Sequence, residues 1–115
     1  MKLNIADREV NGVTILDLSG RITLGAGSLE LREAIHGLVG KGKKKILLNL
    51  AEINYIDSSG VGELVGAYTT IRREGGELKL MRLTKKVHDL MQMTKLYSIF
   101  NVQQDEAQAV ASFTK

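Results

Sequence analysis

The sequence predicts an α/β fold: a mostly parallel sheet with an antiparallel first strand, flanked by about four helices. Stretches with the spacing of strands alternate along the chain with stretches of helical spacing. Asn11-Gly12 lies between the first two strand-like stretches and is a strong signal for a hairpin, which makes these two strands antiparallel. Residues 46–50 form a nearly continuous apolar run, typical of a strand buried on both faces of a parallel sheet.

The first half of the chain supplies the hairpin and one helix. Residues 3–5 alternate apolar and polar side chains, and residues 13–18 resume a strand after the turn. We expect a loop from Gly20 to Gly27 and an N-cap at Ser28. Apolar residues at helical spacing then continue to a stop near Gly40.

The second half repeats the alternation of strand and helix. The expected elements are a strand at 46–50, a helix from about Val61 to the stop at Gly75-Gly76, a strand at 78–83, a helix capped by Thr84, a short strand at 99–102 and a helix opened by Asp105. Gln108 follows Asp105 by three residues, as in a capping box.

Composition predicts one domain over residues 1–115. The chain has 115 residues, of which 43% are hydrophobic and 25% charged. It has no tryptophan and only 4% aromatic residues, so aliphatic side chains must supply most of the core. The absence of cysteine excludes disulfides and cysteine-based metal or redox sites, and is usual in the reducing cytosol.

The sequence also predicts a cytoplasmic protein that neither enters a membrane nor binds nucleic acid directly. Its first residues lack the apolar run of a signal peptide, and no window approaches the ~18 apolar residues that would span a bilayer. The net charge is only +3. Its densest basic run, Lys41 to Lys45, is interpreted as a solvated turn, because no basic face with stacking aromatics is evident.

Residues 54–63, NYIDSSGVGE, join a predicted strand to a predicted helix and are the main candidate site. A serine hydrolase elbow needs the pattern G-x-S-x-G, but Asp57 stands two residues before Ser59. His36 and His88 fall at helical positions with no obvious acid partner, so we expect surface roles for both. We therefore predict no catalytic residue.

Nucleotide and metal sites are not predicted either. Gly40, Gly42 and Lys43 lack the spacing and the hydroxyl of a Walker loop, and Gly25 with Gly27 is a lone G-x-G. Histidines and acids do not cluster at the spacing of metal ligands. We expect the chain to use no cofactor and no metal.

Two interpretations of the junction remain open. Asp57, Ser58 or Ser59 can cap the helix, which is worth roughly 1 kcal/mol, but a cap leaves Gly60 and Gly62 unexplained. Each glycine lowers the stability of the helix by up to ~1 kcal/mol relative to alanine. Because glycine has no side chain, it also leaves room for another group to approach that end of the helix closely. A hydroxyl at a helix N-terminus is also a favourable place to carry a phosphate, which would repel an acidic or apolar partner.

The stretch ILLNLAEINYIDSSGVGELVGAY, followed by GGELKL and TKKVHDLMQMTKLYSIF, resembles the STAS domains of bacterial anti-sigma factor antagonists, or anti-anti-sigma factors. The resemblance covers nearly the whole chain and includes the signature D-S-[ST]-G-[LVI]-G. It implies a regulatory binding protein and not an enzyme. In this family the unphosphorylated protein captures an anti-sigma factor, which is also a serine kinase using ATP, and so frees a sigma factor for transcription.

Carried onto this chain, the resemblance implies a phosphorylation site at Ser58, a flanking acid at Asp57, and a contact surface of Ser59, Gly60 and Gly62. The resemblance further implies that the phosphorylated form releases its partner and that a serine phosphatase resets the switch. Within the same fold, the alternative is an accessory subunit of a lipid or anion transporter, or part of a stress-sensing complex. The intact D-S-S-G favours the phosphoswitch, because an adaptor does not need the acceptor hydroxyl.

One departure from the family pattern concerns the end of the second strand. Family members often carry an acidic pair in G-E-[LI]-D, whereas this chain has Gly20, Arg21, Ile22 and Thr23. We include Arg21 and Thr23 among the predicted partner-binding residues. If this loop lies near Ser58, Arg21 can pair with a phosphoserine or select a different kinase surface; the alternative is an exposed arginine at a strand end.

Overall fold

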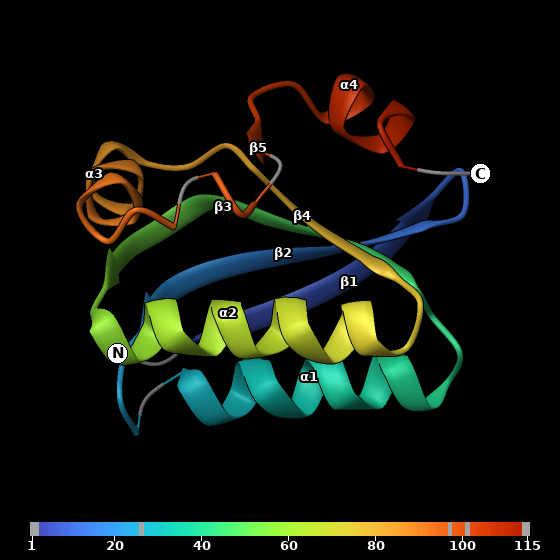
Figure 1. Cartoon of the computed structure of the whole chain (residues 1–115), viewed down its shortest axis with the longest axis horizontal. Helices are drawn as coiled ribbons and strands as arrows, with labels where there is room; N and C mark the ends of the chain where they lie inside the picture. The colour runs from blue at the N-terminus through green and yellow to red at the C-terminus, as the bar shows by residue number, and fades with distance from the viewer. Residues whose placement is uncertain (1–2, 26, 97, 101, 114–115) are drawn as a thin grey trace.

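Five strands form one mixed sheet in the order β1-β2-β3-β4-β5 (Figure 1). The computed structural model describes residues 3–25, 27–96, 98–100 and 102–113. Its elements are β1 (Asn4–Val10), β2 (Val13–Ile22), α1 (Ser28–Gly40), β3 (Lys45–Ile56), α2 (Ser58–Arg73), β4 (Glu77–Met81), α3 (Lys85–Met93), β5 (Val102–Gln103) and α4 (Glu106–Ala111). Strand β1 is antiparallel to β2 and every other pair is parallel, which confirms the predicted fold class and element order.

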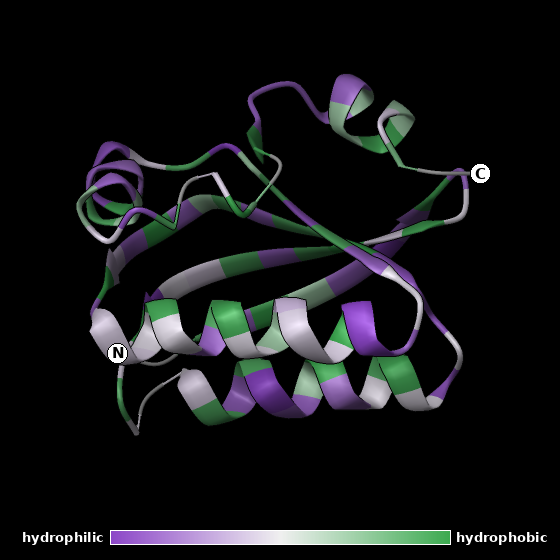
Figure 2. Cartoon of the chain, viewed as in Figure 1, coloured by the Kyte–Doolittle hydropathy of each residue, from purple (hydrophilic) through white to green (hydrophobic). Residues whose placement is uncertain are grey.

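The helices lie on both sides of the sheet. Helices α1 and α2 run side by side along one face, and α4 lies over the other face (Figure 1). The larger apolar cluster joins the sheet to α1 and α2 and extends to α3. A smaller one joins Val13, Ile15, Leu47 and Met81 to α4. Green and purple segments alternate along the helices in Figure 2, as expected for elements with one buried side.

The hairpin between β1 and β2 forms where the sequence predicts it. Val10 pairs with Val13, so the turn consists of Asn11 and Gly12 alone. Both have positive φ, 51° and 83°, as a type I′ turn requires. This turn starts the sheet at the edge strand β1.

The predicted loop from Gly20 to Gly27 begins too early, because β2 continues to Ile22. Gly20 pairs with Ile53 and Ile22 pairs with Ile56, so parallel pairing with β3 extends both strands. Two register shifts interrupt this ladder, and such bulges bend and twist a strand. Both strands therefore reach the start of α2.

The start of α1 also differs from the prediction. Gly27, with φ of 96°, is the N-cap, and Ser28 is the first helical residue. The Ser28 hydroxyl instead donates a hydrogen bond to the Thr23 carbonyl at 2.9 Å. A side chain on Gly27 would overlap the Arg21 carbonyl. Only glycine fits this tight turn, and a sequence signal for a polar cap cannot reveal that.

The later caps are confirmed. Thr84 accepts a hydrogen bond from Val87 N, and Asp105 accepts one from Gln108 N. The strand β4 ends at Met81, before the predicted end at Leu83. The predicted 99–102 strand is largely wrong: Ile99 lies in a turn and Phe100 in a bend, and β5 comprises only 102–103. Position 101 of the predicted 99–102 strand lies outside the described residues.

The basic run is only partly a turn. Lys41 ends α1 as its C-cap, Lys43 forms an ion pair with Glu9, and Lys45 already belongs to β3. Within the described residues, none of the helices combines the length and the apolar character that crossing a bilayer requires.

Candidate functional site

Asp57 stands between β3 and α2 and is the helix N-cap. Its backbone is extended, and its Oδ1 accepts a hydrogen bond from Gly60 N at 2.9 Å. Its Oδ2 accepts a longer one, 3.4 Å, from Leu24 N in the loop after β2. The capping alternative therefore applies to Asp57, and this leaves both serines without a capping role.

Ser58 is exposed and is the first residue of α2. Among the described residues, none forms a hydrogen bond with its hydroxyl. It lies where the helix dipole and the unpaired backbone N–H groups favour negative charge. Ser59 is half-buried beside it. Ser58 is thus an exposed hydroxyl-bearing residue at the start of α2 that takes no part in the cap.

The two glycines of the junction have different surroundings. A side chain on Gly60 would overlap the backbone carbonyl of Ile22 and come within 2.6 Å of Ile56 Cγ1. The group that approaches Gly60 closely is therefore the backbone of β2 in the same protein. Gly62 is exposed and has open space around it. Only Gly62 leaves the bare surface that the sequence predicts.

The end of β2 lies against the junction, which places Arg21 and Thr23 with the candidate site. Asp57 N donates a hydrogen bond to the Ile22 carbonyl at 3.4 Å. Arg21 is paired in register with Tyr55, and its guanidinium lies 4.8 Å from the centre of the Tyr55 ring. Arg21 is therefore half-buried and held by a cation–π contact, rather than being a fully exposed arginine.

Sequence reasoning missed two apolar side chains beside the junction. Leu24 is 78% exposed and Tyr55 is 40% exposed. Tyr55, two residues before Asp57, could have been noticed as an aromatic residue in a polar stretch. Tyrosine and arginine side chains such as Tyr55 and Arg21 are enriched at protein interfaces.

The histidines do not make a catalytic arrangement with the serines. His36 lines a small hollow between α1 and α2 together with Arg32 and Glu63. His88 has an acid neighbour that the sequence analysis overlooked: its Nδ1 lies 3.7 Å from Asp89 Oδ1, which is longer than a hydrogen bond. No group of three or more histidine, aspartate and glutamate side chains suited to a metal ion occurs among the described residues.

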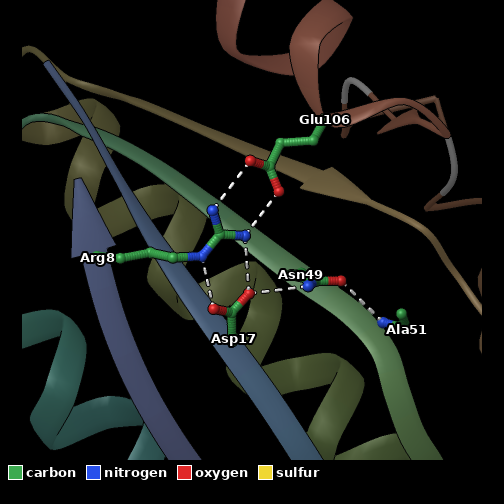
Figure 3. Close-up of polar contacts among 5 residues, drawn as sticks. All are labelled: Arg8, Asp17, Asn49, Ala51 and Glu106. Atoms are coloured by element: carbon green, nitrogen blue, oxygen red, sulfur yellow. Dashed lines mark hydrogen bonds and ion pairs between the residues drawn. The ribbon is translucent and has the colours of Figure 1, made fainter. Parts of the chain in front are cut away.

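A separate polar network joins β1, β2, β3 and α4 (Figure 3). Arg8 binds Asp17 through two hydrogen bonds of 2.7 and 3.2 Å and Glu106 through two of 2.9 and 2.6 Å. Asn49 donates to Asp17 at 2.8 Å and accepts from Ala51 N at 3.1 Å. The hydrogen bonds from Arg8 hold the pKa of both carboxyl groups below their usual values. No sequence motif indicates this network, because its members are far apart in the chain.

Comparison with protein families assigns the fold and the junction to a known domain. The model of the STAS domain matches residues 4–109. The chain belongs to the STAS domain family. Two similar curated proteins are the anti-sigma F factor antagonist of Paenibacillus polymyxa, 28% identical over 96% of this chain and 94% of that protein, and the anti-sigma-B factor antagonist of Bacillus subtilis, 26% identical over 89% and 92%.

Several solved structures share the fold. A putative anti-sigma factor antagonist from Thermotoga maritima has a TM-score of 0.88 at 23% identity, over 96% of this chain and 95% of that one. The Bacillus cell fate determinant SpoIIAA in its phosphorylated form has a TM-score of 0.72 at 20% identity, over 94% and 97%. A murine anion transporter of the solute carrier 26 family matches with a TM-score of 0.75 at 18% identity, over 90% of this chain but 18% of the transporter.

Membership of the STAS family confirms the prediction of a regulatory binding protein and not an enzyme. The two curated relatives are named for antagonism of a regulatory factor, not for a reaction.

Proposed function

We propose that this STAS protein is an anti-sigma factor antagonist whose binding is switched off by phosphorylation of Ser58. The observation that carries the proposal is the exposed Ser58 hydroxyl at the start of α2, beside a cap already supplied by Asp57. The names of the curated relatives support the antagonist role. The phosphorylated form of SpoIIAA supports a switch of this kind within the fold.

A phosphate on Ser58 changes the surface more than the fold. The helix N-terminus stabilises the added charge, about −1.5 to −2 units, so α2 can remain intact. The same charge, next to the Asp57 carboxylate, repels an acidic or apolar partner surface. A differential of ~2 to 4 kcal/mol in binding free energy changes affinity roughly thirty- to a thousandfold. One charged group at the centre of an interface can supply that difference.

The proposed partner is an anti-sigma factor that is also a serine kinase; it uses ATP, while this chain needs no cofactor. A serine phosphatase would reset the switch. The cycle would take place in the cytoplasm, without direct contact with nucleic acid.

The proposed contact surface consists of Ser58, Ser59, Gly62, Arg21 and Thr23, with Asp57 at its edge. Arg21 is held on Tyr55, and we propose that it pairs with an acidic group of the partner or with the phosphate itself. Gly60 is buried, so we assign it a role in packing the junction and not in contact.

The proposal is tested by affinity capture from a lysate of the source organism. Ser58→Ala and Ser58→Glu proteins serve as baits, and Thr69→Glu adds a charge to an exposed position farther along α2 as a matched control. Capture of a histidine-kinase-like ATPase by the alanine and control baits, with loss on the glutamate bait, supports the switch. Retention of the same transporter or scaffold subunits by all baits, with no such ATPase, supports the alternative of an accessory subunit.

A further inference from the structure

A groove of about 490 Å³ lies at the opposite end of β3 from Ser58. Its walls are the tip of the β1–β2 hairpin, the first residue of β3 and the inner side of α4. This volume is within the range of sites that hold small organic ligands. The groove belongs neither to the junction nor to the proposed contact surface.

The walls of the groove are largely apolar. They are formed by Val10, Val13, Val110 and Phe113, with small alanines completing the side of α4. Val13, Val110 and Phe113 are also members of the smaller core cluster, so the groove is an open continuation of that core. An apolar ligand in it would bury surface against side chains that are already ordered.

Polar contacts at both ends of α4 keep the groove open. At its start, Glu106 is held by Arg8. Just after its end, Lys79 donates hydrogen bonds to the Ser112 carbonyl at 2.6 Å and to the Ser112 hydroxyl at 2.9 Å. The Lys79 Nζ also lies 5.0 Å from the centre of the Phe113 ring, which positions that wall. The helix therefore cannot slide toward the hairpin without breaking these contacts.

Lys45 supplies a positive charge to the lining of the groove. Lys45 and Glu106 are the charged lining residues, and both oxygens of Glu106 already accept hydrogen bonds from Arg8. Lys45 is half-buried and, within the described part of the chain, forms no ion pair with a carboxylate. A ligand anion would therefore meet an ammonium group that none of the described carboxylates occupies.

From the apolar walls and the Lys45 ammonium group, we propose that the groove binds a small amphipathic monocarboxylate, such as a medium-chain fatty acid. Its carboxylate pairs with Lys45, and its hydrocarbon chain lies along the valines and Phe113. The ion pair orients the ligand, and the apolar contact supplies most of the affinity. This inference is independent of the role of Ser58.

The test is isothermal titration of the full chain with decanoate, hexanoate and decanol. We expect one decanoate per chain, weaker binding of hexanoate by up to about fourfold per lost methylene, and weaker binding of the uncharged decanol. Lys45→Gln removes the charge and should weaken decanoate binding about fivefold. Lys44→Gln, an exposed neighbour outside the groove, is the matched control and should bind as the unaltered protein does.

A second variant tests the location. Ala111 is an exposed lining residue near the end of α4, so Ala111→Trp should fill the groove and abolish decanoate binding, with folding checked by circular dichroism. Absence of saturable decanoate binding, equal affinity for decanoate and decanol, or unchanged binding by Lys45→Gln or by Ala111→Trp would each overturn the proposal.

Discussion

Substituting alanine at Gly60 and at Gly62 separates packing from helix propensity within one turn of α2. Both residues are helical glycines near the N-terminus of the helix. At Gly60 the new methyl group would overlap the Ile22 carbonyl, whereas at Gly62 it would enter open space. We expect Gly60→Ala to destabilise the protein and Gly62→Ala to stabilise it.

The size of each effect follows from these surroundings. Overpacking a closed site costs roughly 1 to 3 kcal/mol, and alanine returns up to about 1 kcal/mol of helix propensity. The Ile22 carbonyl cannot retreat easily, because it is backbone within the ladder of β2 and β3. With mid-range values of about 2 and about 0.5 kcal/mol, Gly60→Ala loses about 1.5 kcal/mol of unfolding free energy and Gly62→Ala gains about 0.5 kcal/mol.

Urea denaturation followed by circular dichroism measures both changes, with the slope of each transition checked for two-state behaviour. Thermal unfolding should separate the variants by roughly 8 °C, at about 4 °C per kcal/mol for a domain of this size. If Gly60→Ala proves as stable as Gly62→Ala, the packing of Ile22 against α2 is not as tight as the structure indicates.

Two further predictions concern polar contacts. Asp57→Ala should lower the unfolding free energy by about 1 kcal/mol through loss of the cap on Gly60 N, while Asp57→Asn, which keeps an accepting oxygen, should lose much less in the same urea titration. Arg8→Met should lower the unfolding free energy by about 1 kcal/mol near pH 7. The value is modest because the side chains of Arg8 and Asp17 are 39% and 35% exposed. Because Arg8 lowers the folded-state pKa of Asp17 and Glu106, its contribution is present above their ordinary pKa values, near 4, and is lost as the pH falls below them. The variant should therefore show a flatter decline of stability from about pH 5 downward; an equal slope in both proteins would show that the network of Figure 3 does not form in solution.

Local signals explain why much of the fold could be predicted. The hairpin at Asn11-Gly12 and the caps at Thr84 and Asp105 involve residues within a few positions of one another. Residue type and spacing contain that information directly. The same holds for Asp57, whose capping bond reaches only three residues ahead.

The candidate site was only partly predictable. Its centre, Asp57 and Ser58, follows from the strand, the polar run and the glycines in one stretch of sequence. Other parts of the site depend on contacts between residues more than thirty positions apart in the chain. These are the contact of Arg21 with Tyr55 and the hydrogen bonds of Asp57 with Leu24 and Ile22. Spacing within one segment does not encode such contacts.

The sequence by itself determined the class of fold, the order of the elements and the position of the exposed serine at a helix start. Tertiary structure decided how far β2 and β3 extend, which of the two glycines is enclosed, how Arg8 joins α4 to the sheet, and that a groove remains beside Lys45. The physical reason is that periodicity and capping are short-range properties of the chain. Strand length, close packing and ion pairing are decided by what the folded sheet places opposite each residue.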